Sequence, residues 1–473
     1  MEINNKTKHV ISNISYTFVA NLASMLVSIM VILLVPKQLS VEKYGYWQLY
    51  LFYTSYAGFL HFGLCDGIYL RYGGKDYHEL NKEKFGVIFY VLLIYVITVA
   101  CIGGCVSKYL VNDEKKLIVI LFTFISAVFQ LTKTYFSMIL QATNRIKEYA
   151  ICLFIDRGLF GIFVILLLYL RCDNIWYYVI FDIVAKIISL LGLCICCQDI
   201  VTSITLNYRF VKDEIVQNIK AGSSLLFANI ASLLIIGIIR FAVEMKWSIE
   251  TFGKVSLTLS LMNFIMSFIS MISVVIFPIL KKVQEDKLAI IYRHLKVLIV
   301  ALTILIINLY FPVKEILTLW LPQYSISLDY LALLFPYCVF EAKFNLLLNT
   351  YMKILRKEKT ILVVNLLTVV CSFICVILMV GVFENLVGAV ASIVILGLVK
   401  CSLSELFLSR YMNIKYIGGL VQESTMCLVF IIANWFIGGI YGFLIYAIVC
   451  IGYCIYNKNK MLETIKYIRY VIK

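Results

Sequence analysis

Seven basic residues lie inside apolar segments of this sequence, where a charged side chain is costly to bury. A charge at the centre of an isolated membrane helix costs about 3 kcal/mol, and less near the helix ends. The seven are Lys133, Arg157, Lys186, Lys220, Arg240, Lys343 and Lys400. Lys220 and Arg240 lie at the two ends of one segment, from which their long side chains can reach the interface. The other five lie deeper and need a chemical partner.

Two of these lysines have an acid on the same segment. Asp182 and Lys186 are four residues apart, so they can pair on one face of a helix. Lys400 and Glu405 are five residues apart, which gives poorer geometry. An internal ion pair therefore explains Lys186 better than it explains Lys400.

Lys133 has no acid in its own segment and is the best candidate for a cation that binds an external anion. Asp156 and Arg157 are adjacent, so on a helix their side chains point about 100° apart. A lysine offers an anion a point charge and an arginine offers a planar fork, and both suit phosphate oxygens. A cavity with several such cations favours a lipid-linked diphosphate headgroup over a cationic drug.

Polar residues recur at helical spacing on three segments. The three sets are Asn13, Thr17, Asn21, Ser24 and Ser28; Gln130, Lys133, Thr134, Ser137, Gln141 and Asn144; and Ser256, Ser260, Asn263, Ser267 and Ser270. Small polar residues are common where membrane helices pack, and for the serines packing and a cavity wall remain equal alternatives. For the second set, which contains Asn, Gln and Lys, we favour a cavity wall.

The elements that carry these residues are predicted to be transmembrane helices of an all-α polytopic protein. Of the 473 residues, 62% are hydrophobic and 15% are charged, whereas a soluble domain is about half apolar and a quarter charged. This composition excludes soluble domains, disorder and nucleic-acid-binding modules. We predict fourteen helices, at about 11–35, 45–69, 86–107, 117–141, 149–170, 175–197, 218–240, 255–279, 294–312, 328–351, 360–382, 386–409, 416–437 and 439–457. Pro336 is expected to kink the tenth.

The distribution of positive charge predicts the orientation. With the N-terminus in the cytoplasm, the cytoplasmic segments carry 26 Lys and Arg residues and the outer loops carry 9. Because cytoplasmic loops are enriched in these residues, we predict a multi-pass protein with both termini in the cytoplasm. Most of the net charge of +15 then reflects orientation. The 15 cysteines lie mostly in apolar runs and only four histidines are present, so neither disulfides nor a metal site is expected.

Two sequence echoes indicate an internal repeat of six helices. Residues 40–45 read SVEKYG and residues 248–253 read SIETFG, 208 positions later. Residues 140–147 read LQATNRIK and residues 348–357 read LNTYMKILRK. An even-numbered repeat inserts both copies in the same orientation. We therefore expect six-helix halves at 1–212 and 213–412, followed at 413–473 by two extra helices and a basic tail.

The order of several short motifs resembles the polysaccharide flippase family, over about residues 10–410. The motifs are Pro36, Tyr44-Gly45, Phe62-Gly63-Leu64 and Arg71, then Leu140–Ala150, Ile238–Gly253, Ile276–Lys282 and Leu317–Tyr324. One position departs from the family, because Ile239 stands where an acid often precedes the arginine here numbered Arg240. The resemblance implies membership of the multidrug/oligosaccharidyl-lipid/polysaccharide (MOP) exporter superfamily. It also implies two six-helix lobes in a V around a central cavity, with alternating access.

The members it most resembles, the Wzx-type flippases, move undecaprenyl-diphosphate-linked sugar repeat units to the outer leaflet of the bacterial inner membrane for O-antigen (lipopolysaccharide) or capsule synthesis. No enzymatic activity is expected. Besides this lipid-linked oligosaccharide and membrane lipids, a polysaccharide polymerase and a chain-length regulator are candidate partners. Nucleic acid is not expected to bind.

We assign roles to the polar residues on this basis. Lys133, Arg157 and Arg240 would neutralise the diphosphate, and Arg71 would capture it at the cytoplasmic mouth. The sugars would be hydrogen-bonded by Asn21, Gln130, Gln141 and Asn263. A coupling proton or Na⁺ could bind Asp66, Asp182 or Glu341, although each of these acids could instead pair with a cation. No other cofactor is expected.

Two alternatives remain open from the sequence. A cation-coupled multidrug antiporter of the same superfamily would need unpaired acids in its cavity, whereas this sequence is richer in bases. A membrane polymerase of sugar repeats would need a large outer loop, and the outer loops predicted here are short.

Overall fold

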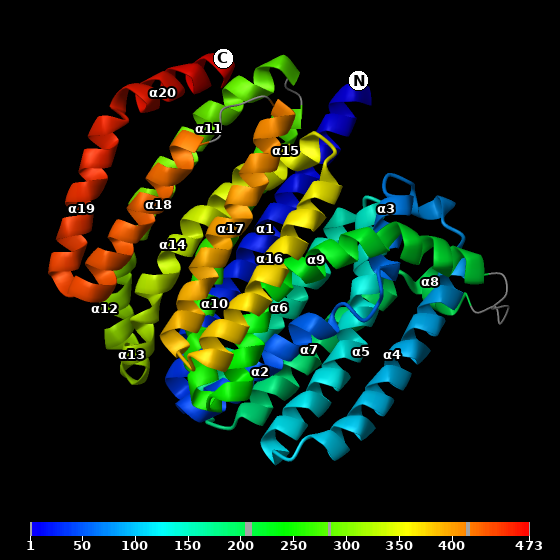
Figure 1. Cartoon of the computed structure of the whole chain (residues 1–473). Helices are drawn as coiled ribbons and strands as arrows, with labels where there is room; N and C mark the ends of the chain where they lie inside the picture. The colour runs from blue at the N-terminus through cyan, green and yellow to red at the C-terminus, as the bar shows by residue number, and fades with distance from the viewer. Residues whose placement is uncertain (1, 204–210, 282–284, 413–416, 473) are drawn as a thin grey trace. The chain divides into compact units, whose positions relative to one another are not determined.

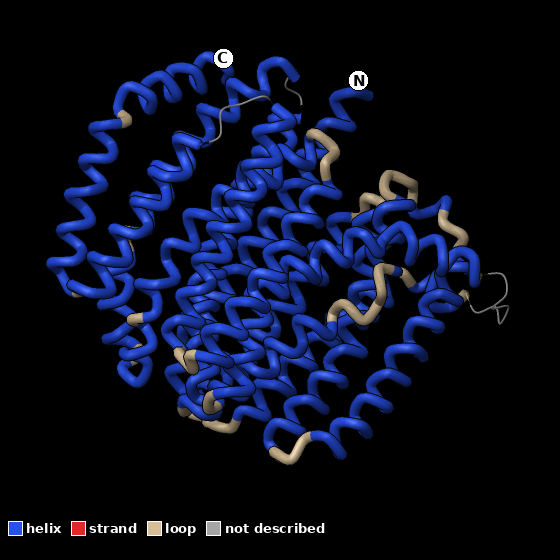
Figure 2. Tube along the Cα trace, viewed as in Figure 1, coloured by secondary structure: helices blue, strands red, loops and turns tan. Residues whose placement is uncertain are grey.

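The computed structural model describes residues 2–203, 211–281, 285–412 and 417–472. Within these ranges the chain is almost entirely helical and contains no strand (Figure 2). Twelve described helical segments are long and apolar enough to cross a membrane. The prediction of an all-α polytopic membrane protein is therefore confirmed. The chain divides into two compact units, Met1–Ile230 and Ala231–Lys473.

The described part of the first unit contains nine elements and the beginning of a tenth. They are α1 (Glu2–Gln38), α2 (Val41–Ala57), α3 (Leu64–Tyr72), η1 (Tyr77–Glu79), α4 (Lys82–Leu110), α5 (Glu114–Ala142), α6 (Ile146–Tyr169), α7 (Ile175–Cys196), α8 (Gln198–Thr202) and the first part of α9 (Lys212–Lys246). Helix α1 packs along α6, and α5 packs against α2, α3, α4 and α7 (Figure 1). This arrangement places α5 at the centre of the unit.

The second unit begins within α9 and contains the remaining elements (Figure 1). They are α10 (Ile249–Lys281), α11 (Glu285–Ile307), α12 (Tyr310–Trp320), η3 (Pro322–Tyr324), α13 (Ser325–Leu328), α14 (Tyr330–Lys343), η4 (Phe344–Leu348), α15 (Asn349–Ile354), α16 (Glu358–Val376), η5 (Ile377–Val382), α17 (Leu386–Met412), α18 (Ile417–Ile431), η6 (Ile432–Ile437), α19 (Gly439–Tyr456) and α20 (Lys458–Ile472). Helix α14 packs against α10, α11, α17 and α18, and it is the most buried of the twelve candidate spans.

All fourteen predicted segments coincide with helices. The segment at 294–312 covers the end of α11 and the start of α12, with a turn at 308–309, and one further segment is broken more widely. The segment at 45–69 forms α2 and α3, separated by a turn in which Phe62 and Gly63 have φ values of 50° and 87°. Helix α10 covers the predicted segment at 255–279 without interruption. Pro336 lies inside α14, and the helix continues beyond it to a π-helical turn, η4.

The broken segment packs closely against α9 within the first unit. A Cβ atom on Gly67 would lie 1.8 Å from the carbonyl oxygen of Asn218, and one on Gly222 would lie 2.0 Å from that of Gly63. Real Cβ atoms do not approach other atoms so closely. These three glycines therefore allow the backbones of α3 and α9 to touch.

The two sequence echoes adopt matching local geometry. The Ser40 hydroxyl accepts the Lys43 amide at the start of α2 (3.4 Å), and the Ser248 hydroxyl accepts the Thr251 amide at the start of α10 (3.3 Å). Both serines therefore cap the helix that follows them.

The second echo forms the same helix ending twice. Residue Asn144 after α5 has a φ of 60°, and Arg356 after α15 has a φ of 54°. The next amide in each case bonds to the carbonyl five residues back, from Arg145 to Leu140 and from Lys357 to Met352, both at 2.8 Å. This is the left-handed ending that commonly closes a helix. The repeat seen in the sequence is thus also a repeat of local structure.

Candidate functional site

Two cations of the first unit share one buried carboxylate. The Nζ of Lys133, on α5, lies 2.6 Å from Oδ2 of Asp156, on α6. The Nε of Arg157 lies 3.8 Å from the same oxygen. The carboxylate side chain is only 4% exposed, whereas that of Arg157 is 44% exposed. Lys133 has no acid on its own helix, and the neighbouring helix α6 supplies one.

A second group of charges lies between α2, α5 and α7. Lys186 pairs with Asp182 at 2.6 Å, as their spacing predicts, and it also donates to the hydroxyl of Ser126 at 2.8 Å. The hydroxyl of Tyr50 donates to Asp182 at 2.6 Å. Three helices thus satisfy both members of this pair.

The five charged residues of these two groups form one electrostatic unit, which we name the first-unit charge cluster: Lys133, Asp156, Arg157, Asp182 and Lys186. They lie on α5, α6 and α7, which pack against one another. Three cations face two carboxylates, so the cluster has one excess positive charge. The side chain of Arg157 is the most exposed of the five. A ligand that reached the cluster would therefore meet a positive centre.

Arg71 is held by α9 instead of standing open. Its guanidinium donates to Glu214 at 2.5 Å, to Gln217 at 2.6 Å and to Asn218 at 2.7 Å. Tyr72 donates to the same Glu214 at 2.7 Å. This network supports the close contact of α3 with α9, so the structure gives Arg71 a packing role that the sequence did not suggest.

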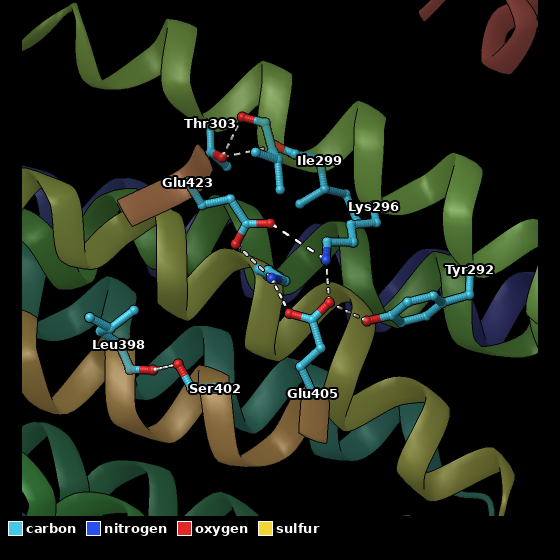
Figure 3. A network of polar contacts seen from close by, with 10 residues as sticks. Tyr292, Lys296, Ile299, Thr303, Leu398, Ser402, Glu405 and Glu423 are labelled. Atoms are coloured by element: carbon cyan, nitrogen blue, oxygen red, sulfur yellow. Dashed lines mark hydrogen bonds and ion pairs between the residues drawn. The ribbon is translucent and has the colours of Figure 1, made fainter. Parts of the chain in front are cut away.

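In the second unit, two lysines and two glutamates form a closed ring of ion pairs, the lysine–glutamate ring: Lys296, Lys343, Glu405 and Glu423. Lys343 contacts Glu405 at 2.5 Å and Glu423 at 2.6 Å, and its side chain has no exposed surface. Lys296 pairs with Glu405 and lies 3.8 Å from Glu423 (Figure 3). Tyr292 donates to Glu405 at 3.2 Å (Figure 3).

The ring connects four helices, because its members come from α11, α14, α17 and α18. Its two positive and two negative charges cancel. Next to it on α14 and α17, Lys400 pairs with Glu341 at 3.2 Å rather than with Glu405, so the partner suggested by its spacing is wrong. Glu341 also accepts from Tyr337 at 2.9 Å. These six charges of the second unit therefore balance.

Comparison with known proteins supplies the fold family. No family model matches the sequence, and no curated protein matches it. Among solved structures, an inward-facing multidrug resistance MATE transporter has a TM-score of 0.63 and 11% identity, covering 85% of this chain and 96% of its own. The lipid II flippase MurJ has a TM-score of 0.63 and 13% identity, covering 95% of this chain and 99% of its own. The fold is that of MOP-superfamily transporters.

A third structure agrees with this assignment. A MOP-superfamily transporter from Pyrococcus furiosus has a TM-score of 0.50 and 13% identity, covering 85% of this chain and 95% of its own. The chain therefore shares the fold of these three structures. At these identities the likeness defines the fold alone, and the similar proteins are transporters and flippases.

The structure distributes the predicted diphosphate cations over both units of this MOP fold. Lys133, Arg157 and Arg71 belong to the first unit, and only the first two share a cluster. Arg240 belongs to the second unit, where it donates to the hydroxyl of Ser256 at 3.0 Å and lies over the ring of Phe252.

The four predicted sugar contacts are spread over three helices. Asn21 and Asn263 are exposed, and Gln130 and Gln141 are half-buried. Gln141 donates to the carbonyl oxygen of Ser137 at 3.2 Å. Of the wider polar sets, the side chains of Asn13, Thr17 and Ser270 lie outside the described part of the chain.

Each of the three acids predicted to couple an ion faces a basic group. Asp182 meets Lys186 and Glu341 meets Lys400. Asp66 is buried in α3 with its Oδ2 3.9 Å from Nε2 of His61, and the other ring nitrogen of His61 accepts the Gly63 amide at 3.0 Å. Asp66 thus has the longest contact of the three.

Sequence reasoning missed Lys296, Glu423 and the role of Asp156 as a shared partner. The partners of Lys343 and Lys133 come from other helices, so no spacing along one helix reveals them. A usable signal was the presence of unexplained acids in the predicted spans at 149–170, 386–409 and 416–437. Acids this deep in a membrane need cations.

Proposed function

We propose that the protein is a flippase that carries undecaprenyl-diphosphate-linked oligosaccharide repeat units from the cytoplasmic to the outer leaflet of the bacterial inner membrane. The product would serve O-antigen or capsule synthesis. The observation that carries this proposal is the excess positive charge of the first-unit charge cluster, in which Arg157 is exposed and Lys133 is half-buried. An anionic headgroup is the ligand that such a centre would stabilise.

The chemistry of the two cations fits a diphosphate. Arg157 has five N–H donors in a planar fork, and its contact with Asp156 is long at 3.8 Å. Lys133 would add a compact ammonium from α5. The predicted sugar contacts Asn21, Gln130 and Gln141 belong to the same unit and would complete this site. Arg240 and Asn263 belong to the second unit and stay predicted contacts. Arg71, held by α9, would act through the α3–α9 contact.

The comparison with the lipid II flippase adds support. That structure covers 95% of this chain, and the multidrug transporter covers 85%. The difference is a tenth of the chain, close in size to the C-terminal segment from α18 to α20. We infer that the substrate is likewise a lipid-linked precursor.

The energy for transport would come from the membrane potential and a coupled ion. Moving one charge through 100 mV corresponds to about 2.3 kcal/mol, and an interior-negative potential favours outward movement of an anion. Asp66 is the preferred candidate for a coupling proton or Na⁺, because Asp182 and Glu341 each lie closer to a lysine.

The test is transport of a fluorescent diphosphate-linked glycolipid in proteoliposomes that contain the full chain. We expect Arg157→Gln to reduce the initial flipping rate at least tenfold. Lys115→Gln is the matched control, because Lys115 forms an exposed pair with Glu42 at 2.7 Å and should leave the rate unchanged. A normal rate in Arg157→Gln at equal reconstitution would contradict the proposal.

A cation-coupled multidrug antiporter is the main alternative, since MATE transporters share the fold. Such a protein needs a carboxylate that can receive a cationic drug. The five carboxylates of the first-unit charge cluster and of the two second-unit networks all pair with lysine. Efflux of a cationic dye would favour this alternative. A sugar-polymerising activity, and contacts with a polymerase or a chain-length regulator, remain predictions.

A further inference from the structure

Asp156 lies beside both of the first-unit cations that we assign to the diphosphate. Its Oδ2 is 2.6 Å from Nζ of Lys133 and 3.8 Å from Nε of Arg157. Asp156 is 3% exposed and lies on α6. Its contact with Lys133 therefore joins two different helices, α6 and α5. A single carboxylate oxygen thus lies between the two cations assigned to the diphosphate.

We propose that Asp156 is an internal counter-anion that competes with ligands for Lys133 and Arg157. It prevents lipids with a single phosphate charge from binding these cations, and a diphosphate displaces it. This inference rests on the proposed function and names what selects its substrate. The membrane surrounding the protein contains abundant phosphodiester lipids, each with one negative charge. A bare pair of cations would bind these lipids, and the site would be blocked before a scarce substrate arrived.

The preference for a diphosphate follows from the number of negative charges that replace the Asp156 carboxylate. When a lipid with one phosphodiester displaces Asp156, one negative charge replaces another, and the displaced carboxylate loses its partners. When a diphosphate diester displaces it, two negative charges meet Lys133 and Arg157. Selectivity of this kind works by penalising the wrong ligand rather than by adding contacts to the right one.

The neighbouring carboxylate shows what a purely structural acid looks like in the same cluster. Asp182 pairs with Lys186 on its own helix, and it receives the hydroxyl of Tyr50. The side chains of Asp182 and Lys186 are 6% and 7% exposed. By contrast, the partners of Asp156 are more accessible, at 16% for Lys133 and 44% for Arg157. Arg157 is thus the most accessible member of the Asp156 contacts.

The test measures binding by the full chain in nanodiscs of zwitterionic lipid. The two probes share one prenyl chain and one sugar and differ only in a single phosphate or a diphosphate linkage. We expect the unaltered protein to prefer the diphosphate probe at least tenfold. Equal affinities for the two probes would overturn the inference without any variant.

Asp156→Asn should raise affinity for the single-phosphate probe at least tenfold and lower the preference to below threefold. Phosphatidylglycerol added to the nanodiscs should then compete with the diphosphate probe in this variant and not in the unaltered protein. Asp156→Glu keeps the negative charge and should keep the preference for the diphosphate probe. This variant provides a second test if Asp156→Asn cannot be purified. Loss of the preference in Asp156→Glu would contradict the inference.

Asp173→Asn is the matched control, because it removes an exposed first-unit carboxylate that pairs with Lys43 at 2.5 Å and does not belong to the cluster. It should leave the preference between probes unchanged. If it changes the preference as strongly as Asp156→Asn does, the effect is one of general charge and the inference fails. If the unaltered protein binds neither probe, both the inference and the proposed diphosphate site fail. If it binds both equally and needs Arg157, only the inference fails.

Discussion

Replacing Lys343 with methionine should strongly destabilise the second unit. Lys343 has no exposed side-chain surface and contacts Glu405 and Glu423 at 2.5 and 2.6 Å. The substitution keeps the apolar length of the side chain and removes one of the two positive charges of the lysine–glutamate ring. Two buried carboxylates then share Lys296 alone, so the ring carries a net negative charge.

The magnitude follows from the two ion pairs that Lys343 makes. Removing one partner of a buried ion pair typically costs about 3–5 kcal/mol, because the other charge stays buried without compensation. Lys343 serves two carboxylates at once, so we expect the loss of stability to reach at least the lower end of this range. A loss of about 3 kcal/mol lowers the ratio of folded to unfolded protein more than a hundredfold.

Titration of SDS into mixed micelles, followed by tryptophan fluorescence, measures this free energy of unfolding. The double variant Lys343→Met with Glu423→Gln leaves Lys296 with Glu405, a neutral pair, and should recover more than half of the lost stability. Lys246→Met is the control, since Lys246 and Glu384 pair at 2.6 Å with 41% and 61% exposure and should contribute at most about 1 kcal/mol. The reasoning is refuted if Lys343→Met unfolds like the control, or if the double variant is no more stable than the single one.

Two further predictions concern the repeat and the helix contact. In the same titration, Ser40→Ala and Ser248→Ala should each destabilise the protein by about 1 kcal/mol, since each removes a helix cap, and a clear inequality between them would argue against equivalent roles in the repeat. Gly67→Ala should lower the yield of monodisperse protein, because its Cβ would lie 1.8 Å from the Asn218 carbonyl oxygen, whereas Gly452→Ala meets nothing within 4 Å and should be neutral or slightly stabilising. Normal behaviour of Gly67→Ala would mean that α3 and α9 do not touch as described.

The sequence predicted the helices well because the relevant signal is local. An apolar run of about 20 residues must satisfy its own backbone in a membrane, and a helix does so without any partner. The break in the segment at 45–69 was not predicted, because the sequence stays apolar through the turn and so resembles one continuous helix. Gly58, His61 and Gly63 were the available signs of a break. Only the contact with α9 explains why the chain turns there.

The ion pairs show the same difference between local and distant partners. A partner on the same helix could be predicted from the sequence, and a partner on another helix could not. The pair Asp182–Lys186 was predicted, because four residues along one helix bring both side chains to one face. Lys133 and Lys343 have partners on other helices, and no periodicity within one segment specifies which helices pack. The sequence shows only that cations inside apolar segments need a partner. Their state as ion pairs required the structure.

Under the proposed function, the pairing of charges gives the two units different roles. In the second unit, the lysine–glutamate ring and the Lys400–Glu341 pair cancel, so these side chains fasten α11, α14, α17 and α18 together and leave no excess charge to attract a ligand. In the first unit, the charge cluster has one more cation than carboxylates, and its exposed member is Arg157. An anion would therefore be stabilised by the first unit, while the balanced networks keep the helices of the second unit together as one body.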